Sequence, residues 1–222
     1  MGFPCSLLEE NTLPEIPDPV DAQNRIIEDD DAGFVTRCRQ GDTEAFAQLV
    51  RRHQKKMLNM AFRMIGDYDE ACDVVQEAFL SAFRAIGKFR EEARFSTWLC
   101  SIVLNQSRSH LKQRAARSDR EGMSLDDPIK SGNGTSSIEH FSQDVSVIER
   151  IEKRELEAKV QRCIGSLDSE QREVLVLRDI QGFSYEEISL SLKLPQGTVR
   201  SRLFRARNAL KDSLLRVLGD LR

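Results

Sequence analysis

The stretch from Ser184 to Lys211 reads SYEEISLSLKLPQGTVRSRLFRARNALK and predicts two short helices joined by a tight turn. Ser184 and Glu187 stand at S-x-x-E spacing, so each side chain can satisfy a free amide at the start of the first helix. Pro195 suits the beginning of the second helix, where no amide donor is needed. Gly197 is expected to let the two backbones pass closely in the bend.

The second predicted helix has an apolar face and a basic face. Its inward stripe, with members at i, i+4, i+7 and i+11, is Val199, Leu203, Ala206 and Leu210. Its outward positions are Arg200, Ser201, Phe204, Arg205 and Lys211. No acidic residue occurs between Gly197 and Lys211. A helix free of carboxylates, turned sharply onto its partner, fits the major groove of DNA, and a solvated or protein-binding face is the alternative.

The composition favours an all-α protein of one large domain or two small ones. The 222 residues include 40% hydrophobic and 31% charged residues, but only 12 Gly and 6 Pro. The formal net charge is −3, and it is unevenly distributed. Residues 1–33 hold nine acidic side chains against one basic side chain, which leaves the C-terminal helix basic.

The sequence contains no motif of a known catalytic, cofactor or metal site. It lacks a Walker glycine loop, a G-x-G-x-x-G segment, an H-E-x-x-H pair and a nucleophile elbow. Its three histidines are scattered, and none of its five cysteines forms a C-x-x-C pair. We therefore expect no catalysis, no cofactor, no metal and reduced thiols. With no signal peptide and no membrane span evident, we expect a cytoplasmic protein.

The rest of the chain divides into two helical modules. Residues 1–28 are rich in proline and acids and are expected to be disordered. Helices are expected at 29–40, 43–65, 69–86 and 98–116, which form a module over 29–117. Residues 118–146 have the composition of a flexible linker. Helices at 149–165 and from about 168 to 182 precede the opening stretch in a second module, 147–222. The linker implies that the two modules need not touch.

Two helices of the first module carry candidate binding faces. The helix at 69–86 buries a wide apolar face and leaves Asp73, Gln76 and Glu77 outside, as a solvated surface or a docking face for a basic partner. The helix at 98–116 begins in the core and becomes basic in its second half, which suits contact with phosphates. Trp98 could stack a base but is better explained as a core residue. His53 is better explained by packing than by metal binding.

Three blocks of the chain together resemble the small two-domain bacterial sigma factors of the extracytoplasmic-function, or sigma-E-like, group. They are DVVQEAFLSAFRAI (Asp73–Ile86), FREEARFSTWLCSIVLN (Phe89–Asn105) and FSYEEISLSLKLPQGTVRSRLFRAR (Phe183–Arg207). The blocks follow the family order, with a spacer between the second and third. The resemblance covers about 29–218 and implies a region 2 bundle and a region 4 helix-turn-helix domain on a flexible linker.

The resemblance also implies roles for the candidate residues. Those expected to dock on the polymerase β′ clamp helices are Asp73, Gln76 and Glu77. In the −10 element, Asn105 matches the position that holds a flipped base, and the residues expected to follow the backbone are Arg108, Lys112 and Arg114. Four residues match the helix that reads the −35 element: Arg200, Ser201, Phe204 and Arg205. The linker would thread toward the RNA exit channel.

The implied partners are core RNA polymerase, through its β and β′ subunits, promoter DNA and an anti-sigma factor. Two other interpretations are open at this point. A dimeric helix-turn-helix regulator that binds operators would explain the second module but would give residues 73–105 no role. A pure interaction protein that binds polymerase or an anti-sigma protein, but not DNA, would not need Arg200 and Arg205.

Overall fold

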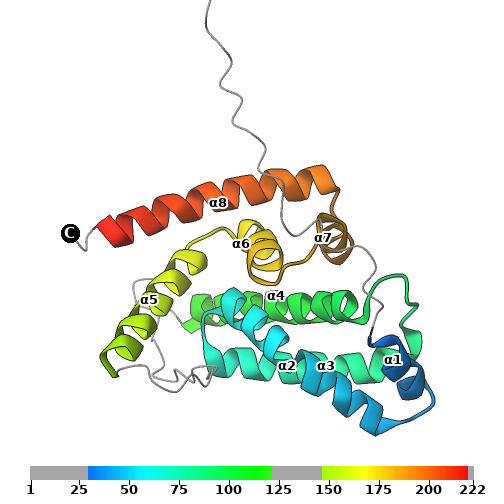
Figure 1. Cartoon of the computed structure of the whole chain (residues 1–222). Coiled ribbons are helices and arrows are strands. Elements are labelled where there is room, and N and C mark those ends of the chain that lie inside the picture. The colour runs from blue at the N-terminus through cyan, green and yellow to red at the C-terminus, as the bar shows by residue number, and fades with distance from the viewer. Residues whose placement is uncertain (1–29, 122–146, 220–222) are drawn as a thin grey trace, which may run out of the picture.

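The computed structural model describes residues 30–121 and 147–219, and within these ranges the regular structure is entirely helical (Figure 1). The expected all-α fold class is confirmed. The acidic segment 1–28 and most of the expected linker lie outside the described residues. In chain order the elements are α1 (Ala32–Arg39), α2 (Thr43–Ile65), α3 (Tyr68–Ala85), η1 (Ile86–Lys88), α4 (Phe95–Glu121), α5 (Val147–Gly165), α6 (Ser169–Leu175), η2 (Val176–Ile180), α7 (Tyr185–Leu192) and α8 (Gln196–Gly219).

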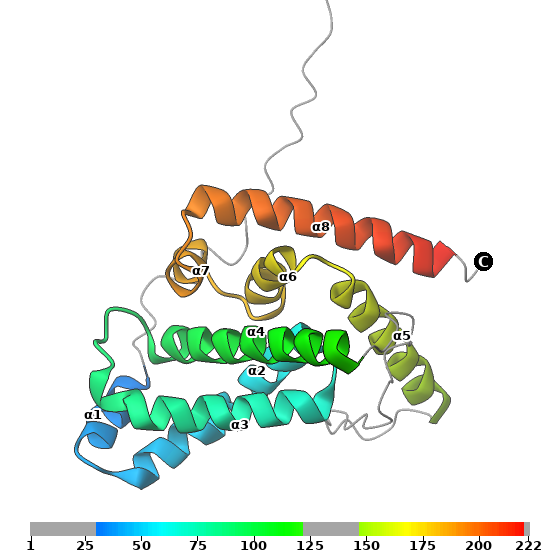
Figure 2. The same cartoon turned by 180° about the vertical axis from the view of Figure 1, so that it is seen from behind.

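Helices α1–α4 form the lower layer in Figures 1 and 2, and their core follows the predicted apolar stripes. The stripe of α2 is buried at Phe46, Leu49, Met57, Met60, Ala61 and Met64. Phe89 and Phe95 are buried beneath the connection between α3 and α4, as expected, and Trp98 packs beside them with ring centroids 4.8 and 5.8 Å away. The structure therefore places Trp98 against the core. Helix α4 ends at Glu121, four residues into the segment expected to be linker (118–121).

Polar residues at the helix ends set the limits of α2 and α3. The Asp42 carboxylate accepts a hydrogen bond from the Ala45 amide at 3.1 Å, and Asp67 accepts one from Glu70 at 2.9 Å. Between the two helices, Gly66 ends α2 with φ +87°, a conformation that glycine adopts without steric cost. These short-range signals explain why the sequence located the two helices to within a residue.

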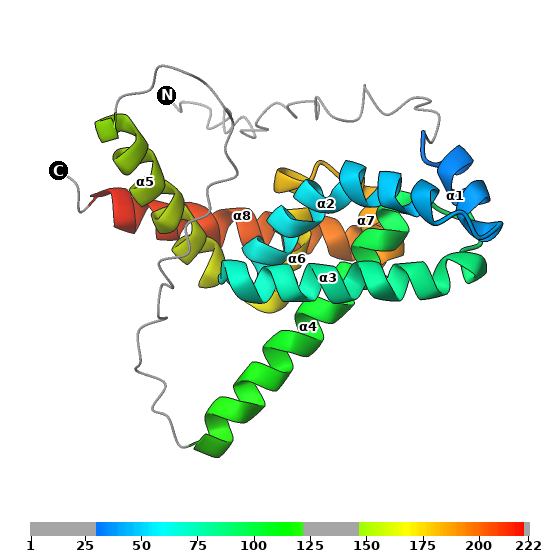
Figure 3. The same cartoon turned by 90° about the horizontal axis from the view of Figure 1, so that it is seen from below.

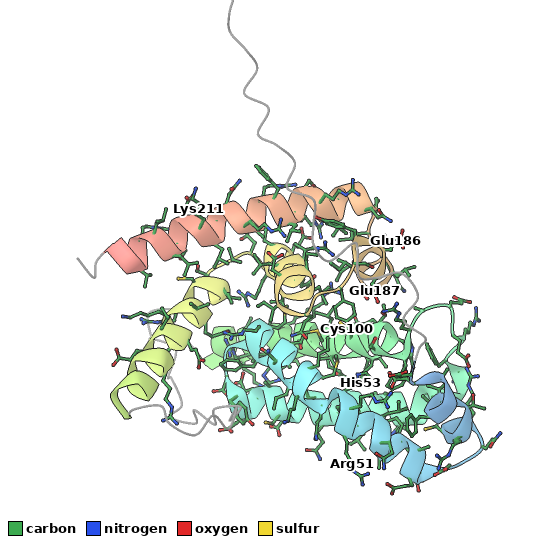
Figure 4. The ribbon with its side chains drawn as sticks, viewed as in Figure 1. Arg51, His53, Cys100, Glu186, Glu187 and Lys211 are labelled. Atoms are coloured by element: carbon green, nitrogen blue, oxygen red, sulfur yellow. The ribbon has the colours of Figure 1, made fainter. Side chains whose placement is uncertain are left out.

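A buried carboxylate ties α1 to α2. Asp31 caps α1 by position, but its side chain points to α2, where His53 Nε2 lies 2.6 Å away and Arg52 donates at 2.8 Å. His53 is buried, as predicted, and Figure 4 shows it on α2 facing α1. Burial opposes ionisation of Asp31, but hydrogen bonds and charges from His53 and Arg52 outweigh it and lower the pKa of Asp31.

Helices α6–α8 form the upper layer, and α5 packs against both α2 and α8. The capping box of α7 is present: the Glu187 carboxylate accepts from the Ser184 amide at 2.9 Å, and Ser184 Oγ accepts from the Glu187 amide at 3.2 Å. Two details of the turn differ from expectation. The positive φ of +55° belongs to Lys193, whereas Gly197 lies within α8 with no close neighbour. Leu190, which with Ile188 and Leu192 supplies the apolar residues of the first predicted helix, is 60% exposed.

The two layers pack against each other, contrary to the expectation of modules that need not touch. Helices α2 and α4 contact α5, α6, η2 and α7, and one hydrophobic cluster runs through both layers. The linker-like composition of residues 118–146 shows only that the two modules are able to lie apart. The packing depends on side chains far apart in sequence, which no local pattern reveals.

The Asp31 cluster generates a stability prediction. Asp31→Asn should lower the free energy of unfolding by about 1–3 kcal/mol near neutral pH, because it weakens charged hydrogen bonds in a buried site. The folded-state pKa of Asp31 is lowered, so its contribution is present above the unfolded pKa and is lost as the pH falls through the folded pKa. Urea denaturation from about pH 7 to about pH 3 should show the two proteins converging in acid.

Asp69→Asn, in the exposed first turn of α3, serves as the control and should change stability little at any pH. If the free energy of unfolding of Asp31→Asn stays below that of the wild type by the same amount across the pH range, the charge of Asp31 does not contribute to stability.

Candidate nucleic-acid and polymerase interfaces

The first turns of α8 present the predicted basic face to solvent. Val199, Leu203 and Ala206 are at most 1% exposed and hold the helix against the domain. The four candidate −35 residues, Arg200, Ser201, Phe204 and Arg205, are all exposed, and Phe204 is 68% exposed. The upper layer therefore buries the stripe that the sequence predicted and leaves the opposite face open, although the domain packs on the lower layer.

The arginines of α8 fall into two groups. Arg202 contacts Glu170 of α6 at 2.9 Å, and Arg207 forms two hydrogen bonds with Asp179, so these residues hold the helix in place. Arg200 instead lies over the Tyr185 ring, and within the described residues no carboxylate contacts Arg200 or Arg205. Their guanidinium groups are the positive charges that the first turns of α8 leave available to an anionic partner.

Helix α3 carries the predicted acidic face, and the structure extends it. Asp73, Gln76 and Glu77 are exposed; Glu77 has a loose contact of 3.6 Å with Arg84, in which both side chains are well exposed. Leu80 and Phe83 follow at helical spacing on the same side, and each is 43% exposed. The apolar spacing of the helix predicts Phe83 on its inward face, and the ring does pack edge-on against Phe46, with centroids 5.0 Å apart, while part of it stays in solvent. The resulting α3 face, Asp73, Gln76, Glu77, Leu80 and Phe83, combines negative charge with apolar surface.

Helix α4 brings together three of its four candidate residues. Asn105, Arg108 and Lys112 are spaced i, i+3 and i+7 and share one side of the helix, and Arg108 Nη1 lies 3.4 Å from Asn105 Oδ1. Arg114 does not join them. It lies nine positions after Asn105, about 180° around the helix, and contacts Glu70 of α3 at 3.0 Å. Figure 3 shows the C-terminal part of α4 projecting away from the other helices.

Sequence reasoning missed Glu173, which binds one of these residues. Its carboxylate accepts hydrogen bonds from Arg108 Nε at 2.5 Å and Nη2 at 2.6 Å, and these bonds raise the pKa of Arg108. Glu173 is only 4% exposed. It precedes Val176 and Leu177 by three and four positions on a buried stripe, and an acid at such a position requires a partner. That rule could have identified Glu173 as a residue that needs a partner, but it could not have identified Arg108 as the partner.

Further polar contacts join the two layers. Glu187 of the α7 capping box also accepts from Thr97 Oγ1 at 3.2 Å, at the layer boundary visible in Figure 4. Arg63 donates to Gln161 at 2.9 Å, and Arg172 donates to the Met64 carbonyl at 2.8 Å. Lys56 lies over the Phe183 ring, and burial lowers the pKa of Lys56. Polar contacts therefore accompany the hydrophobic cluster at this boundary.

The described residues offer little reactive chemistry. Cys100 is buried beside Met60, and burial raises the pKa of its thiol to about 12, so it is a packed thiol rather than a nucleophile. No group of three or more His, Cys, Asp or Glu side chains in the described ranges could hold a metal ion. Among the helices of these ranges, none is both long and apolar enough to cross a bilayer.

Two family models match the chain, one in each layer. Sigma-70 region 2 matches residues 49–117, which include α3 and the candidate part of α4. Sigma-70, region 4 matches residues 157–210, which include the two helices of the opening stretch.

Known sigma factors match most of the chain. The RNA polymerase sigma-H factor of Pseudomonas aeruginosa is 38% identical over 196 residues, or 88% of this chain and 99% of that protein. The ECF RNA polymerase sigma-E factor of Escherichia coli K12 is 37% identical over 186 residues, or 83% of this chain and 94% of that protein. The similarity therefore extends through both layers.

Solved structures agree with this assignment. CnrH in complex with the cytosolic domain of CnrY has a TM-score of 0.59 at 27% identity, covering 84% of this chain and 97% of that one. The sigma factor RpoE of Bartonella quintana, in complex with the anti-sigma factor NepR, has a TM-score of 0.59 at 25% identity, covering 76% and 96%. The chain belongs to the sigma-70 family of RNA polymerase sigma factors, in its extracytoplasmic-function (ECF) group.

Proposed function

We propose that this chain binds core RNA polymerase through the α3 face and directs it to promoters through α4 and α8. The observation that carries the proposal is the presence of an exposed acidic and apolar face on α3 in a molecule whose α8 exposes a basic face. DNA repels the first face and attracts the second. A dimeric operator-binding regulator would use α8 but would have no use for the α3 face.

The α3 face suits a basic protein partner. Asp73 and Glu77 supply negative charge, while Leu80 and Phe83 supply apolar area that is costly to leave in water. The polymerase β′ clamp helices are the partner that family membership supports. A sigma factor has no catalysis of its own, so recognition of polymerase and DNA accounts for the whole function. We place its action in the cytoplasm, where both partners are found.

The α4 residues suit the −10 element. Asn105 offers amide donors and acceptors to the edge of an unpaired base, and Arg108 and Lys112 on the same side can follow the backbone. Arg114 faces α3 instead, so we expect its contribution to be smaller. We propose that α8 reads the −35 element with Arg200, Ser201, Phe204 and Arg205, because arginine binds guanine edges in the major groove.

The same family membership supports a two-domain organisation and a regulatory partner. We propose that residues 29–117 act as region 2 and 147–222 as region 4, with 118–146 between them. The matches at 49–117 and 157–210 fall inside these limits. Since a solved sigma factor of the same fold is bound to an anti-sigma factor, we also propose that such a protein binds this chain.

The α3 face can be tested by reversing its charge. Asp73→Arg combined with Glu77→Arg should abolish binding to core polymerase in a pull-down, because the clamp helices would then meet like charge. The helix content measured by circular dichroism should be unchanged, since both residues are exposed. Asp69→Arg, also exposed on α3, serves as the control. Retention of polymerase by the double variant would show that binding does not use this face.

The α8 face can be tested by arginine truncation. Arg200→Ala and Arg205→Ala should each weaken promoter use by the holoenzyme, at about 1–3 kcal/mol per lost base contact, and should relax −35 specificity. Arg216→Ala, exposed near the other end of α8, should have little effect. Equal promoter use by all three variants would favour a protein that binds polymerase or an anti-sigma factor but not DNA.

Asn105 can be tested through promoter opening. Asn105→Ala should slow melting of the −10 region, because the flipped base loses its hydrogen bonds, while binding to core polymerase is unaffected. Permanganate footprinting of unpaired thymines would measure the effect, with the exposed Gln113→Ala as control. Normal melting by Asn105→Ala would remove this residue from the proposed site.

A further inference from the structure

The contact between Arg108 and Glu173 uses a residue that the proposed function assigns to DNA. Arg108 presents Nε and Nη2 to the two carboxylate oxygens at 2.5 and 2.6 Å, the parallel arrangement in which guanidinium groups also bind phosphate. Its remaining Nη1 lies 3.4 Å from Asn105 Oδ1. Two of the proposed −10 residues are therefore engaged within the chain, and the carboxylate that binds Arg108 comes from the other layer.

The boundary around this pair contains polar contacts besides the hydrophobic cluster that runs through both layers. Its hydrogen bonds include Thr97 to Glu187, Arg63 to Gln161, and Arg172 to the carbonyl of Met64. Water can replace each of these contacts, as it does when domains move relative to one another. Arg108 itself keeps 41% of its side chain exposed, so another anion can approach it from solvent.

In the packed arrangement of the two layers, Glu173 of α6 lies against Arg108 of α4. A DNA phosphate can take the place of this carboxylate only when the two layers move apart at this point.

We propose that Glu173 is an internal substitute for a DNA phosphate. While the two layers are packed together, its carboxylate binds Arg108. When the layers separate, this contact is released and Arg108 becomes available to DNA beside Asn105 and Lys112. The proposal rests on the proposed function, since it takes Arg108 to be a DNA contact. It adds a residue of region 4 that keeps region 2 from DNA until polymerase holds the two domains apart.

The direct test is Glu173→Gln in the full chain, with Glu170→Gln as the matched control. Glu170 lies on the same helix, is 64% exposed at its side chain and pairs with Arg202 inside the upper layer. By small-angle X-ray scattering, Glu173→Gln should have the larger radius of gyration at equal helix content. It should also bind a fluorescein-labelled single strand of about 20 nucleotides about tenfold more tightly, because Arg108 is no longer neutralised.

Two further variants separate opening from DNA contact. Arg108→Ala should expand the chain as Glu173→Gln does, but without the gain in DNA affinity. The exchanged pair Arg108→Glu with Glu173→Arg should restore the compact form, because the ion pair is re-formed with reversed polarity. A Glu173→Gln chain that stays compact, or that expands and binds DNA no better than Glu170→Gln, would overturn the proposal.

The proposed function has its own readout. Wild-type chain added to core polymerase should yield promoter-dependent run-off transcripts whether or not Glu173 acts as proposed. Absence of such transcripts would refute the proposed function. Their presence, together with a Glu173→Gln variant that has the size and DNA affinity of Glu170→Gln, would refute only the proposed role of Glu173.

Discussion

The structure depends on one constraint: α3 and α8 each bury an apolar stripe, and the exposed face opposite the stripe is the one proposed to bind a macromolecular partner. In α8 the stripe of Val199, Leu203 and Ala206 is held in the domain, so Arg200 and Arg205 must point outward. Helix α3 is arranged in the same way, with acids on its outer side. Because one periodicity determines both packing and exposure, the surfaces proposed to bind polymerase and DNA are positioned by the same residues that form the core.

The charges on these outer faces determine which kind of partner each helix can bind. Acidic side chains on α3 repel DNA and suit a basic protein, whereas the start of α8 lacks carboxylates altogether. Cations that serve the fold, such as Arg202 and Arg207, have carboxylate partners, and those proposed to serve recognition have none among the described contacts. The exceptions are Arg114, which pairs with Glu70 of α3, and Arg108, whose partner Glu173 comes from the other layer. The proposed role of Glu173 would link the packing of the two layers to the affinity of the chain for DNA.

Patterns within a few residues predicted much of this. The Ser184–Glu187 capping box, the limits of α2 and the exposed face of α8 all follow from spacing along one helix. Features that depend on distant residues could not be predicted in this way. They are the packing of the two layers and the ion pair between Arg108 and Glu173, which are 65 positions apart. The family resemblance implies a shared −10 role for Arg114 and Asn105, although helical geometry places the two on opposite sides of α4. Gly197 was assigned the tight turn that Lys193 makes with a positive φ.

The central claim is that one chain joins polymerase to a promoter through opposite kinds of surface on separate helices. The most direct measurement is run-off transcription on fragmented genomic DNA by core polymerase, with and without the purified chain. We predict discrete transcripts that appear only when the chain is present and that map downstream of a shared pair of elements. Polymerase that binds the chain but initiates no new transcript would contradict the claim.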